Sequence, residues 1–327
     1  MIIGIESTAH TFGVGVVSNG KILSNCKDSY KNEKGGIIPI EAAKHHEELK
    51  EKVYEEALKK ANIKEREIKA IAFSQGPGLA PCLHIGLNFA KKLASKLKVF
   101  LIPVNHCVAH LEIGRIKGSK DPVLLYLSGA NTQIISYVSG KYRIFGETLD
   151  IGIGNFIDNF ARYIGIGFPG GPKIMELAKN GNYIDLPYSI KGMDVAFSGL
   201  LTNLKQKYES GKYKTEDLAY SLQETAFAML IEAAERALAH TNKNELVLGG
   251  GVACNERLQE MCKIMCEERG CKFFVPENEF LVDNGAMIAY LGEIMFNSGI
   301  KFDSDEFKSL DIKPRERTDD VIVKWRV

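Results

Sequence analysis

Residues 1–27 read MIIGIESTAHTFGVGVVSNGKILSNCK, and residues 122–147 read PVLLYLSGANTQIISYVSGKYRIFGE. Each segment holds three short apolar runs separated by small polar residues, a pattern typical of three strands linked by hairpins. The expected strands cover about 1–7, 12–18 and 21–27 in the first segment and 122–128, 132–138 and 142–147 in the second. The two segments therefore predict the same unit at two places in the chain.

The segments that follow also repeat, in the order helix, strand, helix, strand. The expected elements lie at about 39–61, 69–74, 83–97 and 99–104, and again at 216–241, 245–248, 254–268 and 272–275, before a last helix at 284–297. This order predicts an α/β fold with a mixed sheet built twice, and so two lobes with a cleft between them. We expect an amino-terminal lobe at 1–110 and a carboxyl-terminal lobe at 111–327, with a glycine-rich insertion at about 148–212.

Composition excludes several classes of protein. The chain has 327 residues, of which 45% are hydrophobic and 25% charged, as in an ordinary globular protein. No apolar run reaches the roughly 20 residues that cross a bilayer, and the chain starts on a strand rather than a leader, which predicts a cytoplasmic protein. The net charge of +1 gives no strong positive field, so nucleic acid must bind locally or through partner proteins.

Small polar residues mark the hairpin turn that opens each predicted lobe. The turns are Ile5-Glu-Ser-Thr-Ala-His-Thr11 and Leu127-Ser-Gly-Ala-Asn-Thr132. Backbone N–H groups and hydroxyls at such turns can bind a phosphate or carboxylate, although these residues are also common in ordinary turns. A third element, Gly249-Gly-Gly251 followed by Asn255, lets a ring or sugar approach the backbone closely. Together they predict a site for a nucleotide-like ligand.

Two other glycine motifs do not fit a known nucleotide site. Gly165–Gly170 matches GxGxxG but follows a helix and meets a proline, which argues against a dinucleotide fold. Gly76-Pro-Gly78 lacks the Lys-Ser/Thr ending of a phosphate-binding P-loop.

His106 and His110 are four residues apart on a predicted helix, so their rings share one face and could bind one metal ion. A structural role is the competing interpretation. The intervening Cys-Val-Ala lacks the glutamate of HExxH peptidases, which argues against proteolysis. Two ligands are too few, and Asp283 is the best carboxylate candidate, unless it is the N-cap of the last helix. Tyr126 would lie beside the second polar turn.

Two further groups of residues are interpreted as ordinary surface. Adjacent His45 and His46 should point apart on a charged helix and face solvent. The basic clusters, which are Lys91, Lys92, Lys96 and Lys98 and then Lys313, Arg315 and Arg317, are interpreted as solvated faces.

Four motifs together resemble one family. They are Asn105-His-Cys-Val-Ala-His110, Tyr126-Leu-Ser-Gly-Ala130, Gly249-Gly-Gly-Val-Ala-Cys-Asn255 and Asp283-Asn-Gly285. They are similar to motifs of the universal tRNA N6-threonylcarbamoyladenosine synthases, in the archaeal and eukaryotic branch that supplies the catalytic subunit of the KEOPS complex and was formerly called O-sialoglycoprotein endopeptidase. The resemblance extends from Gly4-Ile-Glu-Ser-Thr8 to Lys313-Pro-Arg315.

The resemblance implies a fold of two duplicated ribonuclease H-like lobes, as in actin, Hsp70 chaperones and sugar kinases. It implies that one divalent ion per subunit, iron or zinc, is bound by His106, His110, Tyr126 and Asp283. It also implies that threonylcarbamoyl-AMP, or AMP and ATP analogues, contact Tyr126, Leu127, Ser128, Gly129, Ala130, Asp158, Gly171, Glu176, Gly250, Gly251 and Asn255. Glu176 departs from the family pattern, because Met175 stands where the family has its acidic residue.

The implied reaction is metal-dependent acyl transfer. The threonylcarbamoyl group moves from threonylcarbamoyl-AMP to the exocyclic amine of the adenosine 3′ to the anticodon, in tRNAs that read ANN codons. No catalytic residue is assigned beyond the metal centre. The implied partners are tRNA and the other KEOPS subunits: a small atypical kinase, a kinase regulator and a dimerising subunit. The alternatives are an ATPase or phosphotransferase of the same fold, the old peptidase assignment and a nucleotide-sensing scaffold.

Overall fold

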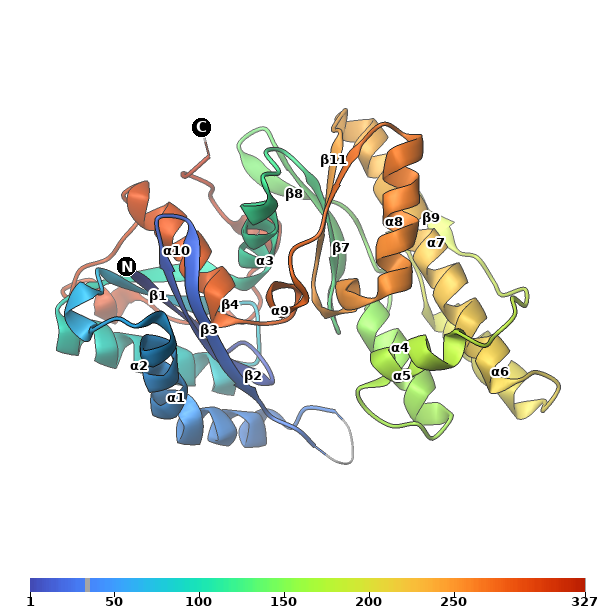
Figure 1. The fold of residues 1–327 in the computed structure, drawn as a ribbon, viewed down its shortest axis with the longest axis horizontal. Coiled ribbons are helices and arrows are strands. Elements are labelled where there is room, and N and C mark those ends of the chain that lie inside the picture. Colours follow the sequence, from blue (N-terminus) through green and yellow to red (C-terminus); the bar gives the residue numbers. More distant parts are fainter. Residues whose placement is uncertain (33–35, 327) are drawn as a thin grey trace. The chain divides into compact units, whose positions relative to one another are not determined.

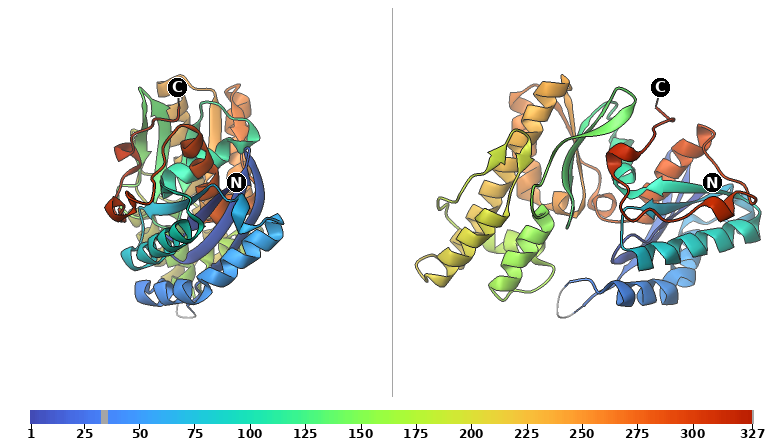
Figure 2. Two further views of the ribbon diagram at one scale, coloured as in Figure 1. Left: turned by 90° about the vertical axis from the view of Figure 1, so that its left-hand side faces the viewer. Right: turned by 180° about the vertical axis from the view of Figure 1, so that it is seen from behind.

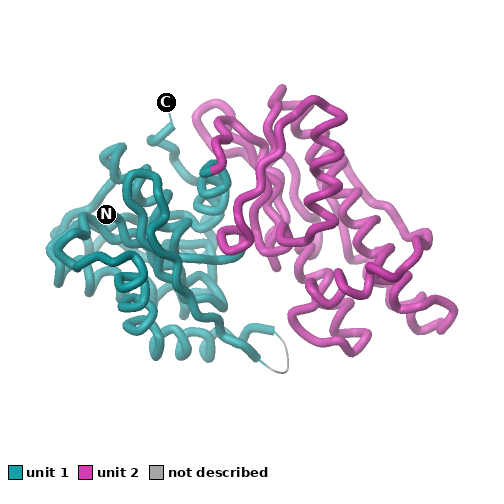
Figure 3. Tube along the Cα trace, in the orientation of Figure 1, with its two compact units in different colours: residues 1–32, 36–116, 282–327 teal, residues 33–35, 117–281 magenta. Residues whose placement is uncertain are grey.

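The computed structural model describes residues 1–32 and 36–326 (Figure 1). The chain divides into two compact units (Figure 3). Among the described residues, unit 1 comprises 1–32, 36–116 and 282–326, and unit 2 comprises 117–281. None of the helices in the described part of the chain is both long and apolar enough to cross a membrane.

Unit 1 contains a five-stranded sheet in the order β3-β2-β1-β4-β5. Strands β1, β2 and β3 are antiparallel neighbours, whereas β4 and β5 extend the sheet in parallel from β1. Its elements are β1 (Ile2–Glu6), β2 (Thr11–Ser18), β3 (Lys21–Ser29), α1 (Pro39–Ala61), β4 (Ala70–Gly76), α2 (Ala80–Leu97), β5 (Phe100–Asn105), α3 (His106–Gly114) and α10 (Gly285–Asn297).

Unit 2 contains a second five-stranded sheet, in the order β12-β11-β6-β7-β8. Its pairing repeats that of unit 1, with antiparallel β6, β7 and β8 and parallel β11 and β12 (Figure 2). The elements are β6 (Val123–Leu127), β7 (Thr132–Val138), β8 (Lys141–Glu147), α4 (Ile153–Tyr163), α5 (Gly170–Ala178), β9 (Ile190–Lys191), β10 (Asp194–Val195), α6 (Ser198–Glu209), α7 (Thr215–Thr241), β11 (Glu245–Gly249), α8 (Glu256–Glu268), β12 (Lys272–Phe274) and α9 (Asn278–Leu281).

The two sheets confirm the predicted duplication. In both units three antiparallel strands are followed by two parallel strands, and a long helix, α1 or α7, precedes the first of the parallel pair. Unit 2 alone inserts α4, α5, β9, β10 and α6 between its third strand and that helix. This is the glycine-rich stretch that the sequence analysis treats as an insertion.

The carboxyl-terminal segment corrects one predicted boundary. The sequence predicts that residues 111–327 form the second lobe, but residues 282–326 belong to unit 1. The reason is that α10, which is hydrophobic on most of its surface, packs against β1, β2 and β4. Gly4 permits this approach, since a Cβ there would lie 2.1 Å from the backbone nitrogen of Ala289.

Candidate functional site

Helix α3 carries the predicted histidine pair in unit 1. Asn105 begins the helix, because its side chain accepts a hydrogen bond from the backbone N–H of Val108 at 3.1 Å. One helical turn then places His106 and His110 on the same face, with ring centroids 4.8 Å apart. Both side chains are buried. The expectation of a shared face is confirmed.

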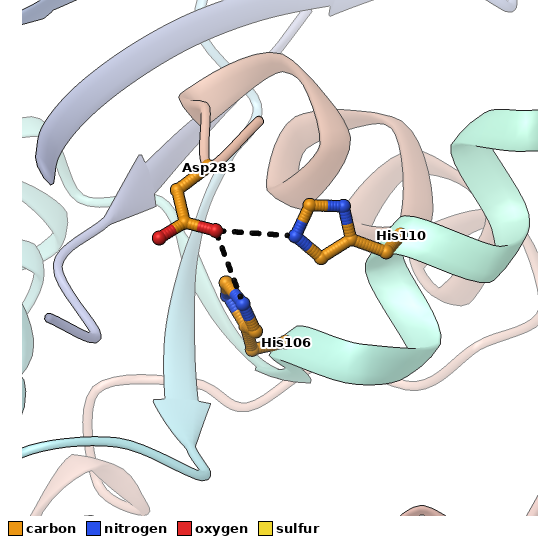
Figure 4. Close-up of side chains that lie close together, drawn as sticks. All are labelled: His106, His110 and Asp283. Atoms are coloured by element: carbon orange, nitrogen blue, oxygen red, sulfur yellow. Dashed lines mark hydrogen bonds and ion pairs between the residues drawn. The ribbon is translucent and has the colours of Figure 1, made fainter. Parts of the chain in front are cut away.

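Asp283 lies opposite this pair (Figure 4). One of its carboxylate oxygens, Oδ1, is 3.4 Å from Nε2 of His106 and 3.3 Å from Nε2 of His110. The competing N-cap role belongs to the next residue, since Asn284 accepts a hydrogen bond from the N–H of Met287 at 2.9 Å. Asp283 is therefore held at the start of α10 with its carboxylate directed at both imidazoles.

The separations of these ligand atoms fit a bound cation. Neutral hydrogen bonds between nitrogen and oxygen are usually about 2.7–3.2 Å long. For metal–ligand bonds of about 2.1 Å, two ligand atoms at tetrahedral corners lie roughly 3.4 Å apart, which agrees with the two distances to Asp283 Oδ1, 3.3 and 3.4 Å. All three ligand atoms lie within 4.8 Å of one another. Two imidazoles and one carboxylate are also a donor set typical of zinc or iron. The cluster could thus hold such an ion.

Glu6, which no sequence motif identifies as a ligand or supporting residue, contacts His106 from the opposite side of the ring. Its Oε2 is 3.0 Å from Nδ1 of His106, and its other oxygen accepts the backbone N–H of Thr8 at 2.7 Å. Glu6 is fully buried at the end of β1. The signal in the sequence that could have identified Glu6 is a charged residue at the end of an apolar strand. The contact leaves Nε2 of His106 directed at Asp283.

The electrostatics of this cluster favour positive charge. Burial disfavours an imidazolium, but the carboxylates of Glu6 and Asp283 outweigh it and raise the pKa of His106 to about 9. Burial lowers the pKa of His110. Burial alone would raise the pKa of Asp283, yet His106 and His110 hold it well below its usual range. The carboxylates of buried Glu6 and half-buried Asp283 thus face the imidazole of His106, and a cation would be stabilised among them.

His46 corrects a prediction about the surface. It was expected to face solvent, but it is fully buried, and its Nε2 lies 3.0 Å from the carbonyl oxygen of Ala9. The spacing Ala42, His46, Val53 and Ala57 places it on the apolar stripe of α1. Burial is the main reason that its pKa falls to about 4, so the neutral ring donates to Ala9.

In unit 2 the predicted glycine turn follows β6 and packs against the start of α4. The carbonyl oxygens of Ser128 and Gly129 accept the backbone N–H groups of Gly154 and Asn155 at 3.2 and 2.9 Å. Gly129 and Ala130 are exposed. A rigid turn therefore presents an open stretch of backbone, whereas the side chains of Tyr126 and Leu127, at the end of β6, are buried.

The triple glycine lies beside the same turn. Gly249 pairs with Tyr126 in the parallel register of β11 and β6, so both strands end at one edge of the sheet. Gly250 has φ of 88°, and a Cβ there would lie 2.3 Å from the carbonyl oxygen of Leu127. Gly251, which begins the short helix after it, is exposed. Only glycine fits at residue 250.

The other residues predicted to bind the nucleotide or the metal ion range from helix-capping residues to an exposed side chain. Asp158 accepts the backbone N–H of Gly170 at 2.7 Å and so ties α4 to α5, while a Cβ on Gly171 would meet open space. Asn255 caps α8, since its side chain accepts the N–H of Arg257 at 2.9 Å. Glu176 lies on the exposed face of α5 and pairs with Lys179 at 2.6 Å. Tyr126 belongs to unit 2, so its part in a metal centre stays a prediction.

Comparison with solved structures identifies proteins that share this fold. HypF of Thermococcus kodakarensis matches 91% of this chain and 48% of its own, with a TM-score of 0.64 and 16% identity. Component A of the Acidaminococcus fermentans (R)-2-hydroxyglutaryl-CoA dehydratase matches 89% of this chain and 96% of its own, with a TM-score of 0.57 and 13% identity. The chain therefore shares the fold of these proteins, with two five-stranded mixed sheets of repeated topology.

Sequence comparison gives the family. The family model described as tRNA N6-adenosine threonylcarbamoyltransferase matches residues 21–290. A protein of that name from Thermococcus sibiricus is 55% identical over 324 residues, covering 99% of both chains. A probable bifunctional tRNA threonylcarbamoyladenosine biosynthesis protein from Methanocaldococcus jannaschii is 53% identical over 99% of this chain and 60% of its own length. The chain belongs to the family of tRNA N6-adenosine threonylcarbamoyltransferases.

Proposed function

We propose that this transferase moves the threonylcarbamoyl group from threonylcarbamoyl-AMP to the exocyclic amine of the adenosine 3′ to the anticodon, in tRNAs that read ANN codons, and that it depends on one divalent ion, iron or zinc. The observation that carries the metal dependence is the pair of imidazole nitrogens 3.3 and 3.4 Å from one oxygen of Asp283. His106, His110 and Asp283 would hold the ion, with Tyr126 as the fourth ligand. A bound ion supplies positive charge that polarises the carbamoyl carbonyl.

The edge of unit 2 where β6 and β11 end would bind the adenylate. The exposed backbone at Gly129, Ala130 and Gly251 offers N–H groups to phosphate or ribose, and the open space at Gly171 admits a ring. The full proposed contact set is Tyr126, Leu127, Ser128, Gly129, Ala130, Asp158, Gly171, Glu176, Gly250, Gly251 and Asn255. Leu127, whose side chain is buried, would contribute only backbone atoms.

The reaction itself exchanges one bond for another. The exocyclic nitrogen of adenosine attacks the carbamoyl carbon and forms a C–N bond, while the C–O bond to the phosphate breaks and AMP leaves with the electron pair. The amine loses one proton to water. The task of the chain is to hold the two reactants in contact, because a leaving group as stable as AMP makes positioning the main requirement.

We also assign the chain to a KEOPS complex in the cytoplasm, with a small atypical kinase, a kinase regulator and a dimerising subunit. A net charge of +1 supports shared tRNA binding. The bifunctional relative also supports it, because this chain covers only 60% of that protein and a second activity shares the polypeptide.

Reconstitution tests this function. The protein, its partners, unmodified tRNA and threonylcarbamoyl-AMP should yield threonylcarbamoyladenosine on nucleoside mass spectrometry, and metal analysis should find one ion per chain. Absence of the modified nucleoside from a metal-loaded mixture would refute the proposal.

The second candidate is an ATPase or phosphotransferase, favoured because full-length HypF, which shares the fold, was solved in a phosphate- and nucleotide-bound form. The two functions differ in their need for RNA. Sustained ATP turnover by the purified chain without tRNA would support the second candidate, and its absence would support acyl transfer.

Glu6→Gln should weaken metal binding about 10- to 100-fold without unfolding the protein. Glutamine keeps the shape of the side chain but removes the charge that lies 3.0 Å from His106. Titration with a chromogenic chelator measures the change. Glu48→Gln, an exposed change on α1, is the control. Equal metal affinity in both variants would show that Glu6 has no supporting role.

Gly171→Ala should reduce affinity for AMP at least tenfold while leaving stability unchanged or slightly higher. A Cβ there meets no protein atom within 4 Å, and alanine favours a helix by about 1 kcal/mol over glycine. Any loss must therefore come from contact with the ligand. Calorimetric titration with AMP and thermal melting check both parts, and unchanged affinity would remove Gly171 from the site.

A further inference from the structure

Four of the seven cations in the two basic clusters named above form ion pairs. In unit 1, Lys92 and Lys96 on α2 pair with Glu51 and Glu65 at 2.8 and 3.0 Å, and Lys91 binds the carbonyl oxygen of Leu310 at 2.7 Å. In the tail, Lys313 pairs with Glu316 at 2.7 Å and Arg317 with Asp319 at 3.0 Å. The four paired cations present little uncompensated charge to a polyanion.

A third cluster, in unit 2, is different. Lys205 and Lys207 on α6, and Lys212 and Lys214 in the turn before α7, form no ion pair within residues 1–32 and 36–326. The turn lysines are exposed. Glu209, the one carboxylate among them, accepts a hydrogen bond from the hydroxyl of Tyr163. The four lysines outnumber this single carboxylate, so residues 205–214 carry a net positive charge.

Two of these lysines lie over tyrosine rings. Lys205 Nζ is 4.8 Å from the ring centroid of Tyr163, and Lys207 Nζ is 4.7 Å from that of Tyr213. Both rings remain more than one-third exposed, at 38% and 37%. Lysines interleaved with exposed aromatic rings combine phosphate attraction with faces on which bases stack, as in surfaces that bind RNA.

The lysine cluster lies at a distance from the proposed adenylate site that a bound RNA could span. Helix α4 begins beside the glycine turn and ends at Tyr163. Its 11 residues span about 15 Å. A target base that reacts beside an adenylate bound at the turn would thus leave the RNA flanking it within reach of the lysines.

We infer that Tyr163, Lys205, Lys207, Lys212, Tyr213 and Lys214, here called the α6 surface, dock the tRNA substrate through its backbone phosphates and a stacked base. This inference rests on the proposed function for the identity of the RNA. The inference gives a location for tRNA binding, which the net charge of +1 for the whole chain does not indicate.

Charge reversal tests the α6 surface. Lys212→Glu with Lys214→Glu changes only exposed turn residues and should preserve the fold. Filter binding of an unmodified tRNA transcript to the full chain at low salt should show affinity lower by about 10- to 100-fold, and the plot of log affinity against log salt should be shallower by about two. Tyr213→Ser should weaken binding about tenfold with an unchanged salt slope.

Lys92→Glu with Lys96→Glu is the matched control, because it makes the same charge change on the neutralised cluster of α2. It should lower affinity less than threefold. Equal losses in both double variants, wild-type binding by the α6 variant, or no binding of the wild-type chain at low salt would each overturn the inference. So would an α6 variant that binds tRNA normally but no longer binds a KEOPS subunit, since the surface would then bind protein.

A separate readout distinguishes this inference from the proposed reaction. Metal content and AMP affinity should be unchanged in the α6 variant. If wild-type protein binds tRNA through the α6 surface but makes no threonylcarbamoyladenosine, the docking inference stands and the proposed reaction fails. If the α6 variant binds and modifies tRNA like wild type, the reaction stands and the docking inference fails.

Discussion

His110→Ala is expected to remove the bound metal and to lower threonylcarbamoyl transfer about 100- to 1000-fold. The imidazole lies 3.3 Å from Asp283, and alanine leaves one nitrogen and one carboxylate on unit 1, too few for a borderline cation. Loss of one group that stabilises charge in a transition state typically has this effect on rate. Elemental analysis of the purified protein and nucleoside mass spectrometry of the tRNA give the two readouts.

The controls separate chemistry from folding. His110 is almost fully buried, so alanine also leaves a cavity on α3. His110→Gln fills more of that space and should lose metal and activity while melting close to wild type. His84→Ala changes an exposed histidine of α2 and should alter neither readout. Full metal content and full activity in His110→Ala would end the proposal of a metal-dependent transferase.

Gly250→Ala is expected to destabilise the protein by about 2–6 kcal/mol and to abolish AMP binding. The residue has φ of 88° and ψ of 159°, a region open almost only to glycine. A Cβ there would also lie 2.3 Å from the carbonyl oxygen of Leu127, which precedes the glycine turn. The strand end and the turn must therefore separate, and the exposed backbone proposed to bind the adenylate loses its shape.

Urea unfolding and calorimetric titration with AMP measure these two effects. Gly199→Ala is the stability control, because it lies on exposed α6 where an added Cβ meets no atom within 4 Å. It should be neutral or slightly stabilising. A Gly250→Ala variant with the urea midpoint and AMP affinity of wild type would show that the close approach to Leu127 does not exist.

The duplicated sheets could be predicted because their signals are local. Each of the segments 1–27 and 122–147 alternates apolar runs with turn residues, and each is followed by helices of ordinary amphipathic period. Strand order then follows from topology, since three hairpin-linked strands and two crossovers leave few arrangements. The assignment of α10 could not be predicted this way, because its hydrophobic surface would suit the sheet of either unit.

In the candidate metal centre, too, only the local arrangement could be predicted from the sequence. The four-residue spacing of His106 and His110 determines their common face through helix geometry alone. Their distance to Asp283 depends on α10 packing beneath β1, and the contact of Glu6 depends on where β1 ends. The burial of His46 was visible in the stripe on α1, but its hydrogen bond to Ala9 was not.

The sequence by itself thus determined the repeated supersecondary pattern, the family and the histidine pair, because each depends on residues close together in the chain. Only the tertiary structure decided that Asp283 and Glu6, 177 and 100 residues from His106, flank one imidazole ring. Contacts over such separations are set by which apolar faces bury each other and by the glycines that let backbones approach. Local periodicity carries no information about either choice.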